Sequence, residues 1–128
     1  MARQILTPEK VHKPTTFYSH AAVIHDVVYS AGQAPHDEAG VVWPMSDIPG
    51  QVRQALENLK VVLHAGGAEF SDIAKMTLFA RTSEVIPIFW EIIKDYLTDN
   101  QPAITVSVVS GLAGSQYMLE VEAIAVKK

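Results

Sequence analysis

The chain of 128 residues contains no cysteine, and its basic residues are few and scattered. The first absence excludes disulfides, thiolate metal sites and a cysteine nucleophile, although it leaves the cellular compartment open. Ten Lys and Arg stand against fourteen Asp and Glu, which gives a net charge of -4. Because nucleic acids and acidic membranes attract clustered cations, this charge pattern predicts neither of them as a partner.

Long hydrophobic runs are also missing. No run approaches the roughly 20 residues that span a bilayer, and residues 1–9 lack the apolar core of a secretory signal. We therefore expect a cytoplasmic protein that is not inserted in a membrane. Hydrophobic residues still make up 48% of the chain and charged residues only 19%, which favours a folded protein. At this length we expect a single domain over residues 1–128.

Two segments have the apolar spacing of three and four residues that is typical of helices. The first covers residues 48–65, where Asp47 or Ser46 can cap the start and Gly66-Gly67 supplies a backbone able to take the left-handed conformation at the end. The second covers residues 84–97. Each segment carries one apolar stripe, so each should bury that stripe against another element.

Strand patterns surround the two helices. They cover residues 17–24, 27–31, 74–80, 104–109 and 117–126, with a short extra strand near residues 3–6. The order β-β-α-β-α-β-β predicts an α+β fold in which two helices pack on one face of a mixed sheet. The pair His25-Asp26 predicts a tight hairpin turn, and residues 34–49 form one long connection that is either functional or a plain crossover.

The strand predicted at residues 117–126 has no clearly polar face. The face that suits packing beneath two helices presents Tyr117, Leu119, Val121, Ala123 and Ala125. The opposite face carries Met118, Glu120, Glu122, Ile124 and Val126. Two helices can cover only one side of the sheet, so the second side implies burial against another copy of the chain. We therefore predict an obligate oligomer.

Two carboxylates on this strand are candidates for chemistry. Glu120 and Glu122 lie two residues apart, so their side chains share one face and could meet the same ligand. Carboxylates on an otherwise apolar face need partners or raised pKa values, which is how acid–base sites are made. The alternative is structural, with one Glu paired to Arg53, Arg81 or a lysine across a subunit boundary.

None of the five histidines shows the i, i+4 spacing of a zinc motif, and no phosphate-binding loop is present. We therefore expect neither a metal nor a cofactor. His20 and His36 are the better site candidates, because His20 lies two residues beyond Tyr18 and His36 follows residues 30–35. The alternative is that both are simply polar residues at a strand end or in a loop.

Several segments match one known family in order and in spacing. They are Tyr18-Ser19, residues 28–35 with the element Ala31-Gly32-Gln33, and residues 51–60, 73–79, 102–103 and 119–126. Together they cover nearly the whole chain, which resembles the RidA/YjgF family. The resemblance implies a chorismate-mutase-like subunit that forms a homotrimer, with three small-molecule clefts at the subunit boundaries.

The resemblance also implies hydrolysis of reactive enamines and imines, in which water attacks the imine carbon and ammonia leaves. Glu120 would orient the water, and Tyr18 or His20 would act as the hydrogen-bond donor. The residues that we expect to bind substrate are Gly32, Gln33, Ala31, Ile104 and His36.

Three polar groups of the family's pocket are replaced by apolar ones. Ile104 stands where the family has an Arg that binds the substrate carboxylate through two hydrogen bonds. Ala31 stands where the family has Ser, and Val106 where it has Cys. Simple 2-imino acids should therefore bind much more weakly. We expect a hydrolase or deaminase-type enzyme for an enamine-like, imine-like or ring-containing metabolic intermediate rather than a standard 2-iminopropanoate deaminase. The alternative is a non-catalytic trimer that binds small metabolites or regulates a partner.

Overall fold

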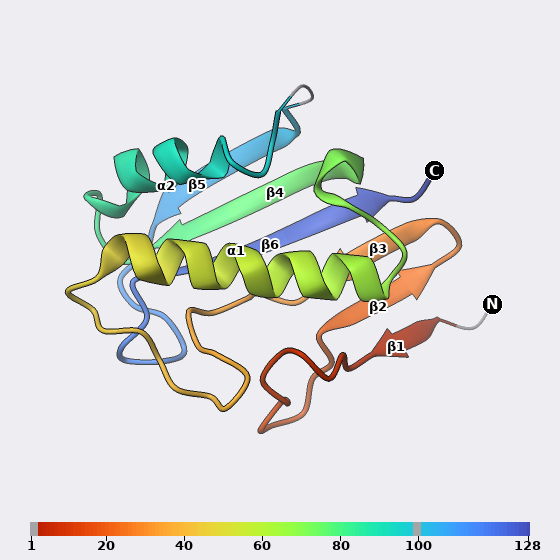
Figure 1. Cartoon of the computed structure of the whole chain (residues 1–128), viewed down its shortest axis with the longest axis horizontal. Coiled ribbons are helices and arrows are strands. Elements are labelled where there is room, and N and C mark those ends of the chain that lie inside the picture. Colours follow the sequence, from red (N-terminus) through yellow and green to blue (C-terminus); the bar gives the residue numbers. More distant parts are fainter. Residues whose placement is uncertain (1–2, 99–100) are drawn as a thin grey trace.

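A mixed six-stranded sheet forms the centre of the protein (Figure 1). The computed structural model describes residues 3–98 and 101–128. The strands are β1 (Gln4–Leu6), β2 (Ala21–Ile24), β3 (Val27–Ser30), β4 (Ile73–Ala80), β5 (Ala103–Val108) and β6 (Leu119–Val126). Their order in space is β1-β2-β3-β6-β4-β5, with β4 and β5 parallel and the other pairs antiparallel. The predicted extra strand near the N-terminus is confirmed as β1.

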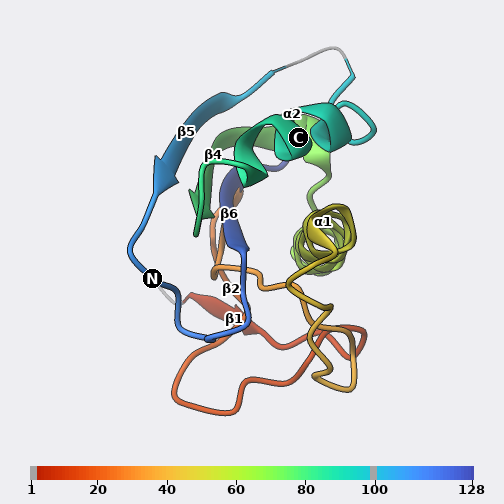
Figure 2. The same ribbon diagram turned by 90° about the vertical axis from the view of Figure 1, so that its left-hand side faces the viewer.

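Two helices, α1 (Ile48–Ala65) and α2 (Val85–Ile93), lie on the same face of the sheet (Figure 2). A short 3₁₀ helix, η1 (Phe70–Asp72), precedes β4. This arrangement confirms the predicted α+β fold and the element order. Within the described residues, no helix has the length and apolarity needed to cross a membrane.

Residues next to α1 in the sequence determine where the helix begins and where it ends. Asp47 Oδ1 accepts the Gly50 N–H at 3.0 Å and so caps the start of the helix. At the other end Gly67 has a φ of +87°, in the left-handed region that favours glycine. Gly66 allows Val28 to approach closely, because a Cβ at Gly66 would lie 2.8 Å from Val28 Cγ1. The predicted span of this helix is confirmed.

The second helix is shorter than predicted, since it ends at Ile93 rather than at Leu97. Asp95 and Tyr96 donate their N–H groups to carbonyls three residues back, at 3.0 and 2.9 Å. These three-residue turns are tighter than the turns of an α-helix, so the regular α-helical hydrogen bonds end at this point.

The first long strand is also shorter than predicted, because β2 begins at Ala21 rather than at residue 17. The Tyr18 N–H donates to the Thr16 carbonyl at 3.1 Å, and this tight turn takes the chain out of the sheet. The hairpin that follows is confirmed. Strands β2 and β3 pair directly on either side of His25-Asp26, with His25 at a φ of +54°.

The hydrophobic core lies between the helices and the sheet. Leu56, Leu59 and Leu63 of α1 and Phe89 of α2 are fully buried there. The helix-facing side chains of β6 are buried as predicted, and they are Leu119, Val121, Ala123 and Ala125. Burial on this scale supplies the main driving force for folding.

The opposite face of the sheet is bare in the single chain (Figure 2). The strand register places Ile5 beside Ala22, Ala22 beside Tyr29, and Tyr29 beside Ile124, so an apolar row crosses four neighbouring strands. Ile5, Tyr29 and Ile124 are 46%, 44% and 37% exposed. Contiguous exposed apolar surface of this kind is typical of a contact with another protein.

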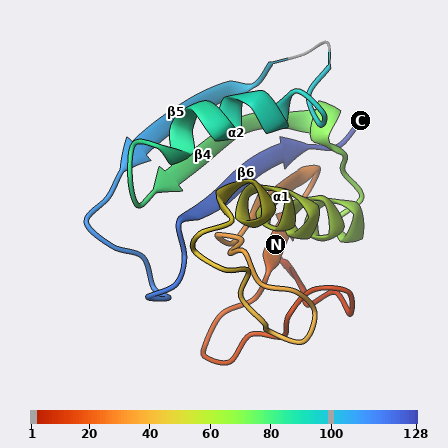
Figure 3. The same ribbon diagram turned by 60° about the vertical axis from the view of Figure 1, so that its left-hand side comes forward.

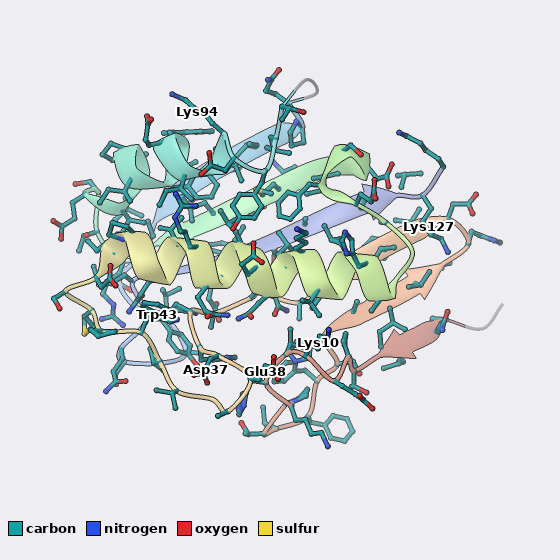
Figure 4. All side chains as sticks on the ribbon, in the orientation of Figure 1. Lys10, Asp37, Glu38, Trp43, Lys94 and Lys127 are labelled. Atoms are coloured by element: carbon teal, nitrogen blue, oxygen red, sulfur yellow. The ribbon has the colours of Figure 1, made fainter. Side chains whose placement is uncertain are left out.

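Two long loops, residues 7–20 and 31–47, lie side by side at one end of the sheet (Figure 3). The His12 ring of the first meets the His36 ring of the second edge-on, with 4.7 Å between ring centroids. Helix α1 holds the second loop through two contacts. Asn58 Nδ2 donates to the carbonyls of Ala34 and His36, at 2.9 and 2.8 Å. Trp43, which lies beside α1 in Figure 4, donates its Nε1 hydrogen to Gln54 at 3.0 Å.

Candidate active site

A cleft of about 480 Å³ opens where the two loops meet the start of β6. Seven of the eight residues that the sequence singled out line this cleft, and they are Tyr18, His20, Ala31, Gly32, Gln33, His36 and Glu120. Ile104 is not among the lining residues. Glu122 and Tyr117 complete much of the polar wall. The structure therefore brings together candidates that are more than 100 residues apart in the sequence.

Glu120 is placed by the pairing of two chain segments. It lies opposite Phe79 of β4, on the face of β6 that points away from the helices. Gln33 and Val121 exchange both backbone hydrogen bonds, at 2.7 and 3.1 Å, which brings Gly32 alongside Glu120. A Cβ at Gly32 would lie 3.4 Å from Glu120 Oε2, which is an ordinary van der Waals distance, so Gly32 and the carboxylate are direct neighbours in the cleft.

The electrostatic surroundings favour the protonated form of Glu120. Burial raises the pKa of its carboxyl, and the negative charge of Glu122 raises it further. A carboxyl whose pKa moves up toward neutral pH is better suited to take and return protons than an ordinary surface carboxylate.

Two tyrosines face this carboxyl. Burial, followed by the charge of Glu120, raises the pKa of Tyr18 and also that of Tyr117. Both phenols therefore stay protonated at neutral pH and act as hydrogen-bond donors. Gly114 makes room for one of them, because a Cβ there would lie 2.4 Å from Tyr117 Cζ. Arg81 fixes the same segment by donating to the carbonyls of Tyr117 and Gly114, at 2.7 and 3.2 Å.

His20 and Gln33 form the support beneath the cleft. His20 is 2% exposed, and its Nε2 bonds to the carbonyl of His12. Its Nδ1 lies 3.2 Å from Gln33 Nε2, which also donates to the Ala31 carbonyl at 3.3 Å. Since the amide donates to Nδ1, the ring hydrogen must lie on Nε2, and both nitrogens are occupied. Of the two predicted donors, Tyr18 therefore remains available to donate to a substrate, whereas both ring nitrogens of His20 already have hydrogen-bond partners.

The comparisons with known proteins show the family of the chain. The family model described as Endoribonuclease L-PSP matches residues 9–127. The chain belongs to this family, which is the RidA/YjgF family. A RutC family protein from Pyrococcus abyssi is 32% identical over 129 residues, which cover 100% of both chains.

Two further relatives bear on activity and on fold. The 2-iminobutanoate/2-iminopropanoate deaminase of Rattus norvegicus is 29% identical to this RidA/YjgF chain, over 98% of the chain and 90% of the relative. The solved structure of YyfA, a Rid family protein from Yersinia pestis, is 28% identical and superposes with a TM-score of 0.92. That match covers 98% of this chain and 99% of the other.

Ile104 lies on the opposite side of the sheet from Glu120. It pairs with Met76, which is fully buried beneath the helices, and it packs against the hydrophobic core. In a parallel pair, side chains that lie side by side share a face, so Ile104 points to the helix side. Its strand β5 is at the edge of the sheet. Within one RidA/YjgF subunit, Ile104 therefore cannot reach the cleft that contains Glu120.

Tyr117 is a cleft residue that sequence reasoning did not identify. The predicted strand included it and placed its ring on the helix-facing side, whereas β6 begins only at Leu119. A signal was available, because Tyr117 lies in a Gly- and Ser-containing segment just before Glu120. His12 was also missed, and only the folded arrangement of the two loops places it against His36.

A second hollow of about 490 Å³ lies beside the cleft and shares Tyr18 and Ala31 with it. Its other walls include Ile5, Ala22 and Tyr29, which belong to the apolar row on the bare face of the sheet. No group of three or more His, Asp or Glu able to hold a metal occurs in residues 3–98 and 101–128. The two carboxylates Glu120 and Glu122 line the first cleft and not this second hollow.

The raised pKa of Glu120 predicts a pH-dependent effect on stability. A carboxyl with a folded-state pKa above its unfolded value contributes stability below the unfolded pKa, and this contribution is lost as the pH rises through the folded pKa. Glu120→Gln, which is uncharged throughout, should therefore raise the Tm more at pH 7 than at pH 4. Thermal unfolding at both pH values measures this difference. Glu38→Gln, on an exposed loop residue, is the matched control; an equal effect of Glu120→Gln at both pH values would contradict the prediction.

Proposed function

We propose that this chain is a hydrolytic deaminase that acts on a reactive enamine or imine. The observation that carries the proposal is the position of Glu120 in one cleft with two protonated phenols and the open backbone at Gly32. The similarity to an imino-acid deaminase supports the same class of reaction. Neither a metal nor an organic cofactor enters the proposed reaction, since water is the only co-substrate.

The proposed reaction begins with the imine form of the substrate. The Glu120 carboxylate accepts a proton from water as the water oxygen bonds to the imine carbon, and the electron pair of the carbon–nitrogen double bond moves to the nitrogen. Tyr18 donates a hydrogen bond to the reacting group and stabilises the charge that develops on it. Glu120 returns the proton to the nitrogen, which gives a carbinolamine. Glu120 then takes the hydroxyl proton and passes it to the amine as the carbon–nitrogen bond breaks, so that the bond electrons leave with ammonia and a carbonyl product remains.

We further propose that the chain works as a homotrimer. The apolar row of Ile5, Ala22, Tyr29 and Ile124 crosses the bare face of the sheet beside the cleft, and an aqueous protein gains free energy by covering such a surface. Another copy of the chain offers the edge strand β5, which is the strand that carries Ile104. Since Ile104 cannot reach the cleft of its own subunit, we propose that any contact between Ile104 and substrate is made across the edge strand, in the cleft of a neighbour.

The proposed substrate is not a simple 2-imino acid. An apolar side chain at residue 104 offers no partner for a carboxylate, and Ala31 offers no hydroxyl. A larger, less acidic or ring-containing intermediate fits these apolar walls better. A cleft of about 480 Å³ has room for such a molecule.

Ammonia release tests the proposal directly. Purified protein is mixed with freshly generated 2-aminoacrylate and, separately, with larger enamines of low acidity, and the rate of ammonia formation is compared with the uncatalysed rate. Faster release from the larger enamines is expected. If ligands bind in the cleft but no substrate is altered, the alternative of a non-catalytic metabolite-binding or regulatory trimer replaces the enzyme. Faster release from 2-aminoacrylate would refute our interpretation of Ile104.

A single exchange tests the role assigned to Ile104. Ile104→Arg should lower the KM for 2-iminopropanoate by about tenfold to a hundredfold, because a guanidinium can form two charge-assisted hydrogen bonds with a carboxylate. Ile104→Lys is the matched control, since it restores the charge without the planar fork and should improve KM less. Steady-state kinetics on the two variants, both first shown to be folded, measures the effect. An unchanged KM in Ile104→Arg would show that residue 104 does not contact substrate.

A further inference from the structure

His36 lies in the wall of the cleft, and its ring is almost fully enclosed. It is 8% exposed and contributes to the lining of the cleft together with Tyr117, whose ring centroid is 6.0 Å away. Its backbone is fixed, because Asn58 donates to its carbonyl at 2.8 Å and the residue pairs with Val42 across the loop. A side chain held this firmly is preorganised for a ligand.

One ring nitrogen of His36 has no partner. Nδ1 is buried and makes no hydrogen bond, while the edge of the ring is covered by His12 at a centroid distance of 4.7 Å. Placing the ring hydrogen on Nδ1 would bury an unsatisfied donor, which costs about 1–3 kcal/mol. The hydrogen is therefore favoured on Nε2, which makes Nε2 the donor of this ring.

The surroundings also keep His36 uncharged. Burial lowers the pKa of its ring most and the nearby His12 lowers it further, whereas the backbone of His36 raises it by a smaller amount. His20 lowers the pKa and the backbone of Asp37 raises it, and both of these effects are weaker still. The His36 imidazole is thus a neutral donor at neutral pH. Tyr117, which adjoins it, is a second neutral donor.

We propose that His36 recognises a hydrogen-bond-accepting oxygen at the end of the substrate remote from the reacting carbon, through Nε2–H. This inference rests on the proposed function and specifies its substrate class, namely an extended enamine or imine with a distal carbonyl-type oxygen. Gly32, beside the catalytic carboxyl, and His36 are four positions apart along the chain, so their Cα atoms are at most about 13 Å apart.

The chemistry of this end of the cleft favours oxygen over nitrogen in the ligand. His36 Nε2–H and the Tyr117 hydroxyl both offer hydrogens, and a carbonyl-type oxygen accepts two. An ammonium group would meet the His36 Nε2–H, which offers it no acceptor. The same donors discriminate against an alkyl end, because desolvated donors would then be left unpaired.

Two imino acids of equal length provide the test. One ends in an ester carbonyl and the other in an alkyl group, and an amino-acid oxidase generates both from their amino acids. The wild-type chain should favour the carbonyl-ended substrate by about tenfold in kcat/KM. His36→Phe should abolish this preference by lowering kcat/KM for the carbonyl-ended substrate about tenfold more than kcat/KM for the alkyl-ended substrate. His36→Gln, which keeps an N–H donor, should retain part of the preference.

Two controls keep the inference separate from the proposed function. The corresponding 2-oxo acids are titrated against each variant by calorimetry, so the preference is also measured where no turnover occurs. If the wild-type chain hydrolyses neither substrate yet shows a His36-dependent preference in binding, the proposed function fails and the inference stands. If His36→Phe keeps the preference, or weakens both ligands equally, the inference is overturned. His36→Leu replaces His36→Phe if the latter does not fold.

Discussion

Glu120→Gln is expected to lower kcat for imine hydrolysis by a factor of about 10² to 10⁴, which is the usual contribution of a positioned general base. Glutamine has nearly the same shape as glutamate but cannot take a proton from water. Because the exchange leaves Gly32 and the Gln33–Val121 pairing intact, KM should change little. Steady-state rates of ammonia release measure both constants.

Glu122→Gln is the matched control for this prediction. Glu122 lies on the same face of β6 and lines the same cleft, but it pairs with Thr77 and lies farther from Gly32. Its exchange should therefore lower kcat by less than about tenfold. A loss of rate that is equal in the two variants, or a Glu120→Gln variant with full activity, would remove Glu120 from the proposed role of base.

Ile124→Lys is expected to break the proposed trimer and abolish turnover without unfolding the subunit. Ile124 is 37% exposed in the single chain, so a lysine at this position can reach water there. In the assembly the same ammonium would be buried without a counter-charge, at a cost of about 3–5 kcal/mol per contact. Association should weaken by more than about a hundredfold. Sedimentation velocity, circular dichroism and ammonia release measure the three consequences.

Val41→Lys is a suitable control for Ile124→Lys. Val41 is 62% exposed on the loop that follows β3, away from the bare face of the sheet. The same change of an exposed apolar side chain to lysine should leave mass and activity unchanged. If Ile124→Lys stays associated with full activity, the apolar row is not the contact between copies.

The sequence allowed most of the fold to be predicted because its signals are local. The capping Asp47 and the left-handed Gly67 define α1, and the pair His25-Asp26 defines the first hairpin. The errors arose where hydrogen bonds override an apolar pattern. The turn from Thr16 to Tyr18 removes the start of a predicted strand, and tight turns after Ile93 shorten α2.

The site could be predicted partly from a strand pattern and partly from the family resemblance of loop residues such as Gly32. Glu120 follows from the alternation of β6, and Gly32 from the segment after β3 that pairs with it. The role of His20 depends on Gln33 and the His12 carbonyl, which no spacing indicates. The side of the sheet on which Ile104 lies depends on its parallel register with β4. Such long-range contacts are fixed by tertiary packing rather than by local pattern.

The central claim is that the working cleft is completed by a neighbouring copy of the chain. Specific activity and molecular mass measured together over a dilution series test it most directly. The account predicts a species of three times the 14.0 kDa chain mass at micromolar concentration, with specific activity that falls only where lighter species form. Full specific activity in a sample that sediments as a single 14.0 kDa chain would contradict it.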